Sequence, residues 1–214
     1  MWTRARAVAL VLSGLTLAAC GNIHPGDAAV VDGRSISMKS LDKTAKIYCK
    51  LTLLSAQQQG GTAPGNADIR RQAIGGMVTV VVARKVAAAK GVTPEPQTYE
   101  LTPAQRDQVA KEFPSTADEV TKAIEDSRET SQIATVLGEL STGATATSDN
   151  QAQLAQVGDE QIIKAFSTYH VHIAPRFGLS DKLNKVASTG SLSVPDTKVH
   201  KTADSELPAA QRCV

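Results

Sequence analysis

Apolar residues recur at helical spacing along most of the chain. From Leu41 to about Gln59 they fall three or four residues apart, which favours an amphipathic helix with one buried face. Ser37 precedes this run and is a typical N-cap. The stretch Ala67 to Ala89 keeps the same spacing, although its valines also have strand propensity. Because helix formers follow and Gly91 is placed as a C-cap, we predict one long helix, nearly all apolar in its middle and buried on several sides.

Two more helices are predicted in the middle of the chain. Thr102-Pro103-Ala104-Gln105 is a capping-box pattern with proline at the first helical position, and a short helix should run from it to about Phe113. Thr116 opens the next helix in the same way. Its predicted apolar stripe reaches Leu137 and Leu140.

A last helical stretch begins at about Ser148 to Gln151. We expect Gly158 to interrupt it and Asp159 to restart it. The buried edge of this last piece is predicted to consist of Ile162, Ile163 and Phe166.

Near both ends of this helical region, the apolar residues recur at every second position, which is the spacing of a strand. Ala28 to Val31 reads as a strand, and Asp32-Gly33 is a hairpin turn signal before a return strand at residues 34–36. Tyr169 to Ala174 alternates and ends at Pro175, which predicts a strand with His170 and His172 on one face. We therefore predict a mainly α fold with a small sheet made by the N-terminal hairpin and a C-terminal strand.

The first twenty residues have the pattern of a lipoprotein signal. Two arginines precede an apolar run, which ends in Leu17-Ala18-Ala19-Cys20. Small residues before a cysteine are typical of a lipobox, so Cys20 is the predicted lipidation site and new N-terminus. The chain then divides into a signal (1–19), a tether (20–27), a domain (28–178) and an irregular tail (179–214). This places the protein on the extracytoplasmic face of a bacterial cell membrane.

Charge and hydropathy narrow the choice of partners. The signal holds two of the 23 lysines and arginines, so the rest of the chain balances 21 basic against 21 acidic residues. A balanced charge argues against a nucleic-acid partner. After the signal, no apolar stretch is expected to approach the length of a membrane span, so acyl chains on Cys20 would supply the membrane affinity.

Cys49 and Cys213 are the two cysteines that remain after the signal. An even number in an oxidising compartment favours a disulfide, whereas the alternative is two unrelated buried thiols. On the chain-entropy model, closing so long a loop contributes roughly 5 kcal/mol.

The sequence has no catalytic signature that we recognise. It lacks a G-x-S-x-G elbow, an H-E-x-x-H motif, a C-x-x-C motif and a phosphate-binding glycine loop. Glu125 and Glu129 lie four apart, but a solvated helix face has the same charges. His170 and His172 are the most site-like pair, and zinc would need a further ligand. We therefore expect no enzyme, no cofactor and no metal.

Three segments together resemble the SurA-like and PrsA-like extracytoplasmic chaperones. Val30-Val31-Asp32-Gly33-Arg34-Ser35-Ile36-Ser37 is similar to the strand that leads into the first helix of that family. Residues 70–92 resemble its long apolar second helix. Val171 to Gly178 resembles the V-x-V-N-P-R-F-G strand of actinobacterial lipoproteins with a SurA-type N-terminal domain, although Ala174 replaces the usual Asn.

The resemblance implies a peptide-binding helical module without the prolyl isomerase domain, since residues 92–160 are too few to hold that domain as well as the predicted helices. It implies ATP-independent binding of unfolded or extended exported polypeptides in an apolar cleft between helices. Candidate cleft residues are Met77, Val80, Val81 and Val82, with core packing as the alternative for each. The alternative function is a structural lipoprotein that binds one dedicated envelope partner.

Overall fold

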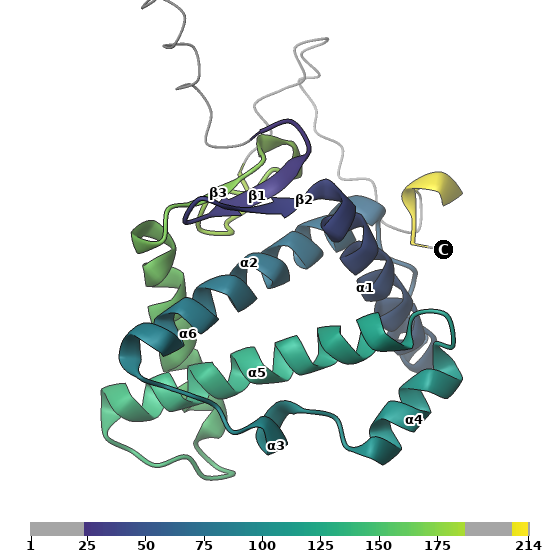
Figure 1. Ribbon diagram of the computed structural model, residues 1–214. Helices are drawn as coiled ribbons and strands as arrows, with labels where there is room; N and C mark the ends of the chain where they lie inside the picture. Colours follow the sequence, from purple (N-terminus) through teal and green to yellow (C-terminus); the bar gives the residue numbers. More distant parts are fainter. Residues whose placement is uncertain (1–23, 187–206, 214) are drawn as a thin grey trace, which may run out of the picture.

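A computed structural model describes residues 24–186 and 207–213 (Figure 1). The first part of the chain forms a hairpin and two long helices, and further helices and a short strand follow. The elements are β1 (Asp27–Val31), β2 (Arg34–Ser37), α1 (Met38–Gln59), α2 (Asn66–Lys90), α3 (Pro96–Tyr99), α4 (Pro103–Glu112), α5 (Ala117–Thr142), α6 (Gln151–Thr168), β3 (Val171–Ile173), and the 3-10 turns η1 (Pro175–Phe177) and η3 (Ala209–Gln211). The predicted mainly α fold with a small sheet is confirmed.

The sheet joins the two ends of the helical region. β1 lies in the middle, antiparallel to β2 on one side and to β3 on the other. Val30 pairs with Ser35 across the hairpin and with His172 across the other ladder. Because β1 is buried along its whole length, the sheet is held by its apolar central strand. The predicted hairpin and the pairing of the chain's two ends are confirmed.

Local signals place the ends of the helices. Ser37 accepts a hydrogen bond from the backbone N–H of Ser40 and caps α1, and Gly91 ends α2 in the left-handed region with φ of 68°. Thr102 and Gln105 form the predicted capping box of α4. Thr116 departs from its prediction, because its hydroxyl is buried and has no hydrogen-bond partner among the described residues.

Helix α2 is the centre of the main core. It contacts α1, α5, α6, β1 and η1, and its side chains at Ile74, Val78 and Val82 are fully buried. The valines lie in a helix because burial on several sides outweighs their modest strand propensity. A smaller cluster beneath α4 contains Phe113 and Val120. The two clusters meet along α1 and α5, which therefore carry apolar residues on more than one face.

By length and mean hydropathy alone, α2 could also cross a membrane. This corrects the expectation that no apolar stretch after the signal reaches spanning length. In the structure α2 packs between the other helices and the sheet, and its paired charges include Arg84 and Lys85. Its apolar composition is thus accounted for by core packing.

Helices α5 and α6 approach each other so closely that glycine is required at their crossing. A Cβ atom at Gly158 would lie 1.8 Å from the carbonyl oxygen of Ala134, and one at Gly138 would lie 2.0 Å from that of Leu154. The predicted interruption at Gly158 is therefore wrong, because α6 runs through it without a break. Leu140 and Ile163 were predicted to be buried, but they are 62% and 45% exposed.

The chain continues to pack against the domain beyond the predicted boundary at Gly178. Leu179 is buried, and Leu183 contacts the main core. The Asp181 carboxylate accepts a hydrogen bond from the backbone N–H of Ile173 at 2.9 Å. Residues 179–186 thus complete the packing beside β3 without adding a strand or helix to it.

We predict that Gly158→Ala destabilises the protein strongly. The added methyl group would meet backbone rather than a movable side chain, so the free energy of unfolding should fall by about 3 kcal/mol. Urea unfolding measures this change. The matched control is Gly75→Ala, because a Cβ there meets only Leu183 at an ordinary 3.8 Å and the change should stabilise α2 by up to about 1 kcal/mol. Equal stabilities for the two variants would contradict the close approach.

Candidate functional site

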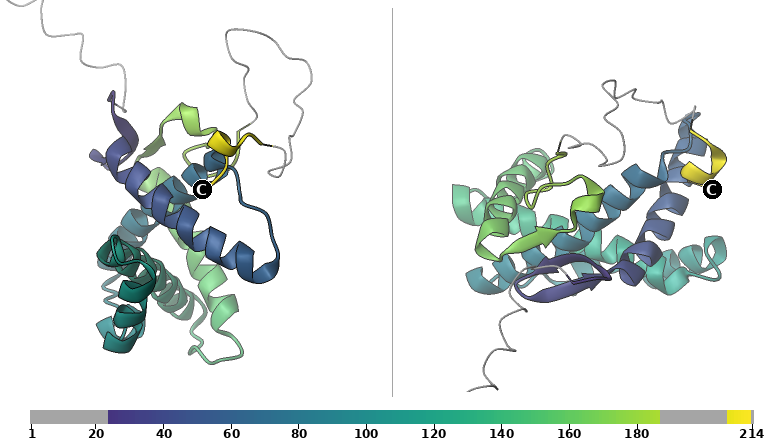
Figure 2. Two further views of the ribbon diagram at one scale, coloured as in Figure 1. Left: turned by 90° about the vertical axis from the view of Figure 1, so that its right-hand side faces the viewer. Right: turned by 90° about the horizontal axis from the view of Figure 1, so that it is seen from above.

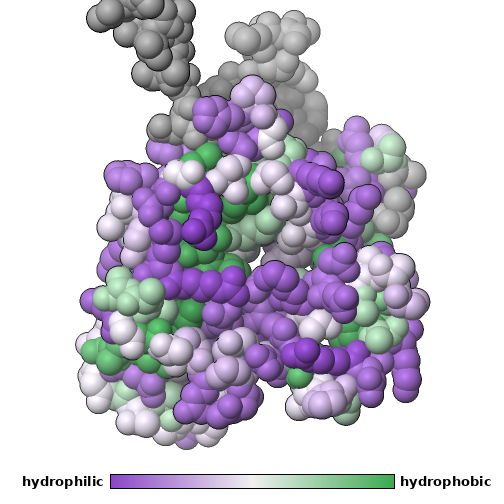
Figure 3. Space-filling model, in the orientation of Figure 1, coloured by the Kyte–Doolittle hydropathy of each residue, from purple (hydrophilic) through white to green (hydrophobic). Residues whose placement is uncertain are grey.

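A groove of about 520 Å³ opens between α1, α2 and α5. In Figure 1 these helices form three sides of a triangle below the sheet. Figure 3 shows hydrophobic surface set back in this area and hydrophilic residues around it. Its lining alternates small, apolar and charged side chains: Ile36, Ser40, Lys43, Thr44, Ile47, Tyr48, Gly76, Met77, Thr79, Val80, Val81, Arg84, Glu119, Lys122, Ala123, Asp126, Ser127 and Thr130.

Three of the four residues predicted for a cleft line this groove. Met77, Val80 and Val81 lie on the face of α2 that turns toward it, and each is partly exposed. Val82 does not line it and is fully buried in the main core. The prediction for Val82 is wrong because it lies about 100° further around the helix than Val81, which is enough to carry its side chain from the groove into the core.

Tyr48 supplies a polar group inside the groove. A Cβ atom at Gly76 would lie 2.5 Å from the Tyr48 hydroxyl, so the absence of a side chain on α2 makes room for the phenol. Burial, and then the nearby Asp126 carboxylate, raise the pKa of Tyr48 above its usual value. The phenol is therefore protonated at neutral pH and can donate a hydrogen bond to a carbonyl group in the groove. Sequence analysis did not single out Tyr48 or Gly76.

Charged side chains link α2 to α5 at the rim of the groove. Arg84 donates to Asp126 at 2.7 Å and to both oxygens of Glu129, and Lys122 pairs with Asp126 at 2.6 Å. The hydrogen bonds to Glu129, with Asp126 nearby, raise the pKa of Arg84 above its usual value.

The two carboxylates of the Glu125/Glu129 pair have different partners. Glu129 is bound by Arg84, whereas Glu125 accepts hydrogen bonds from Arg106 and from the backbone N–H of Leu101. These carboxylates are held by cations and do not face each other as an acid–base pair.

The groove continues toward α4 through two smaller hollows. The first, about 410 Å³, shares Tyr48, Ala123 and Ser127 with the groove. The second, about 360 Å³, shares Leu51 and Ile124 with the first and reaches Phe113. Along α1 the three hollows extend from Ser40 to Gln58, a helical distance of about 27 Å.

The two histidines of the predicted strand do not share a face. His170 lies before β3, where its φ of 47° turns the backbone out of the strand. His172 is on β3, and its Nδ1 lies 3.3 Å from an Asp181 oxygen. Within residues 24–186 and 207–213, no three histidine, cysteine or acidic residues are grouped to hold a metal ion. The histidine pair predicted from the alternation is therefore wrong in its geometry.

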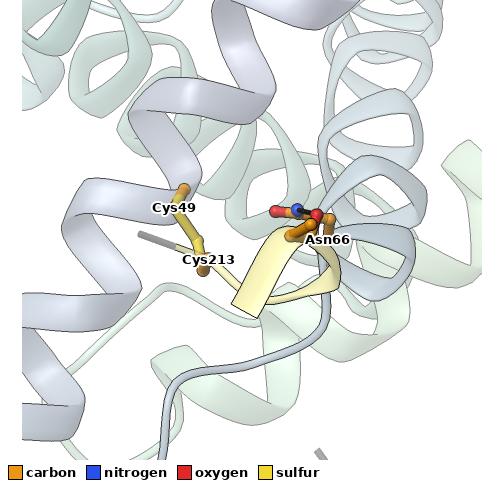
Figure 4. The surroundings of a disulfide bond; sticks show 4 residues. Cys49, Asn66 and Cys213 are labelled. Atoms are coloured by element: carbon orange, nitrogen blue, oxygen red, sulfur yellow. Dashed lines mark hydrogen bonds between the residues drawn. A yellow bond between two sulfur atoms is a disulfide. The ribbon is translucent and has the colours of Figure 1, made fainter. Parts of the chain in front are cut away.

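Cys49 and Cys213 are joined as a disulfide, with their Cα atoms 5.6 Å apart (Figure 4). Two hydrogen bonds hold the same C-terminal segment: the Cys213 N–H donates to the Pro64 carbonyl at 2.9 Å, and the Asn66 side chain donates to the Ala210 carbonyl at 3.2 Å. Both turned views place this segment beside α1 and α2 (Figure 2). The C-terminus therefore fastens the start of α2 to the middle of α1.

The predicted signal and the lipidation site at Cys20 lie outside the described residues, as does part of the tail at residues 187–206. β1 begins at Asp27, the last residue assigned to the tether. No family model, curated protein or solved structure matches this chain.

We predict that Cys213→Ser lowers the free energy of unfolding by roughly 2–5 kcal/mol, because the unfolded chain would lose the closure of a long loop. Urea unfolding with and without a reductant measures the effect. The reductant should destabilise the unmodified chain and leave the variant unchanged. Peptide mapping should recover Cys49 and Cys213 in one linked species. Two free thiols in the oxidised protein would contradict the pairing.

Proposed function

We propose that this protein is a lipid-anchored extracytoplasmic chaperone that binds unfolded or extended exported polypeptides without ATP. The observation that carries the proposal is the open groove between α1, α2 and α5, with Met77, Val80 and Val81 exposed to it. Partly exposed apolar side chains in a hollow of this size are typical of a ligand or partner surface.

The shape of the groove favours an extended chain as its ligand. Together with the two hollows beside it, the groove extends about 27 Å along α1, which corresponds to roughly eight residues of extended polypeptide. The groove is open rather than closed, so a longer chain could enter and leave without threading. The apolar lining attracts hydrophobic side chains without reading their order, because hydrophobic burial is not directional.

The polar groups of the groove suit a peptide backbone. The Tyr48 phenol can donate to a carbonyl, and the Lys122, Arg84 and Asp126 charges are already paired with one another. A chain bound there would meet the Tyr48 phenol as a donor, with the opposite charges of Lys43 and Glu119 also lining the groove, so that the rim is close to neutral. This combination favours broad binding of apolar segments over selection of one charged ligand.

The resemblance to SurA-like and PrsA-like chaperones supports the same proposal, as does the lipobox pattern ending at Cys20. A second candidate is an assembly lipoprotein with one dedicated envelope partner. The exposed side chains of Leu140 and Ile163, on the outer surface of the α5–α6 pair, favour it, since they lie away from the groove and could serve a fixed contact.

The two candidates are separated by adding residues 21–214 to an unfolded exported protein during refolding and following aggregation by light scattering. We expect suppression at near-stoichiometric ratio without ATP. Val80→Glu should weaken client binding at least tenfold, because it places a charge in the apolar lining.

Ala88→Glu is the matched control, since Ala88 is exposed on the same helix and does not line the groove. Urea unfolding should show that both variants remain folded. Absence of suppression by the unmodified chain would rule out general client binding and favour the dedicated-partner alternative. Equal suppression by the two variants would place client binding outside the groove.

A further inference from the structure

Helix α1 has a stripe of lysines on its outer face. Lys39, Lys43, Lys46 and Lys50 follow one another at spacings of four, three and four residues, so they lie within about 60° of one another around the helix. All four are exposed. Asp42 is the single acidic residue of this helix, which makes the outer face strongly positive.

The lysines of this stripe form no ion pair in the described part of the chain. None of the four takes part in an ion pair or a side-chain hydrogen bond there, whereas Arg70, Arg84 and Lys122 on the neighbouring helices are all paired. Lys43 also borders the groove, with Glu119 on the opposite side of it. A single-sign stripe without partners is unusual on a chain whose remaining charges are so often paired.

The positive surface widens near the middle of α1, where the disulfide fastens this helix. Lys46 and Lys50 border a hollow of about 290 Å³ together with Arg70 and Arg212. Asp42 neutralises Arg70 at 2.7 Å, but no carboxylate lines the hollow itself. The stripe and the hollow together form one basic face, defined by Lys39, Lys43, Lys46, Lys50, Arg70 and Arg212.

We propose that this basic face docks on the surface of a bilayer that contains anionic phospholipids. The lysines from Lys39 to Lys50 cover about 17 Å along one helix, which lets several phosphate headgroups be contacted at once. Juxtamembrane basic residues are attracted to such surfaces, and their attractions add. A planar, negatively charged surface complements a straight, exposed lysine stripe.

The position of the predicted anchor agrees with this orientation. The Met38 N–H at the start of α1 donates to the Gly26 carbonyl at 2.8 Å, so the chain leaves the fold beside the first lysine of the stripe. Cys20 precedes Gly26 by six residues, which can span at most about 20 Å. This step rests on the lipid anchor of the proposed function. Acyl chains on Cys20 would hold the basic face within reach of the headgroups.

Docking on this face would also orient the groove. On α1 the residues that line the groove, such as Ser40, Thr44 and Tyr48, lie about a third of a turn from the lysine stripe. With the lysines on the headgroups, the groove opens to the side, along the membrane surface. A polypeptide that emerges from the membrane would then meet the groove without the domain having to turn over.

The test measures co-sedimentation of residues 21–214, which have no anchor, with lipid vesicles. All described contacts of the fold lie between residues 24 and 213, so this chain retains them. We expect binding to vesicles in which phosphatidylglycerol replaces a third of the phosphatidylcholine, and none to phosphatidylcholine alone. Binding should weaken progressively as the salt concentration rises, because the attraction is screened.

The variant K39Q/K46Q/K50Q should bind the anionic vesicles about tenfold more weakly than the unmodified chain. The matched control K90Q/K111Q/K164Q removes the same charge from exposed sites on α2, α4 and α6 and should bind as the unmodified chain does. Neither variant changes a groove residue, so suppression of aggregation without vesicles should persist in both. Loss of that suppression in the unmodified chain would count against the proposed function and not against docking.

Three results would overturn the proposal. These are equal binding to neutral and anionic vesicles, equal loss of binding in the two triple variants, and full competition by millimolar inorganic phosphate. The last result would indicate that the hollow bordered by Lys46, Lys50, Arg70 and Arg212 binds free phosphate and not a membrane surface.

Discussion

Burial of α2 is the constraint on which the rest of the structure depends. The middle of this helix is apolar on nearly every side, and α1, α5, α6 and the central strand of the sheet each cover part of the helix. These neighbours leave part of α2 uncovered where α1 and α5 diverge. The C-terminal half of α5 is drawn onto α6 by the contacts at Gly138 and Gly158, whereas its N-terminal half packs with α4. The groove lies where neither neighbour closes over α2.

The groove and the basic face are adjacent surfaces of the same helix. α1 presents its apolar side to the core, its small and aromatic residues to the groove and its lysines to solvent. The disulfide joins α1 to the C-terminal segment, and hydrogen bonds join that segment to the start of α2. Because both surfaces belong to α1, they keep a fixed relation to each other. In the proposed function, this fixed arrangement would present one preformed groove to many different unfolded chains.

Much of the fold could be predicted because its signals are local. Ser37, Gly91 and the Thr102 capping box act within one helical turn, and the hairpin signal at Asp32-Gly33 acts within four residues. What could not be predicted depends on tertiary contacts. In the sequence, Gly158 looks like the end of a helix. The structure shows that glycine is needed there because the Ala134 backbone of α5 packs against it. Likewise, the same valine run supplies both groove and core, and only the positions of α1 and α5 show that Val82 belongs to the core.

The central claim is that unfolded chains bind in the groove, and methionine-methyl NMR tests it most directly. Residues 21–214 contain two methionines, Met77 in the groove and Met38, which packs against the main core at the start of α1. On titration with an unfolded exported polypeptide, we expect the Met77 methyl signal to shift and saturate while that of Met38 stays in place. A shift of Met38 alone, or of neither signal under conditions that suppress aggregation, would contradict the account.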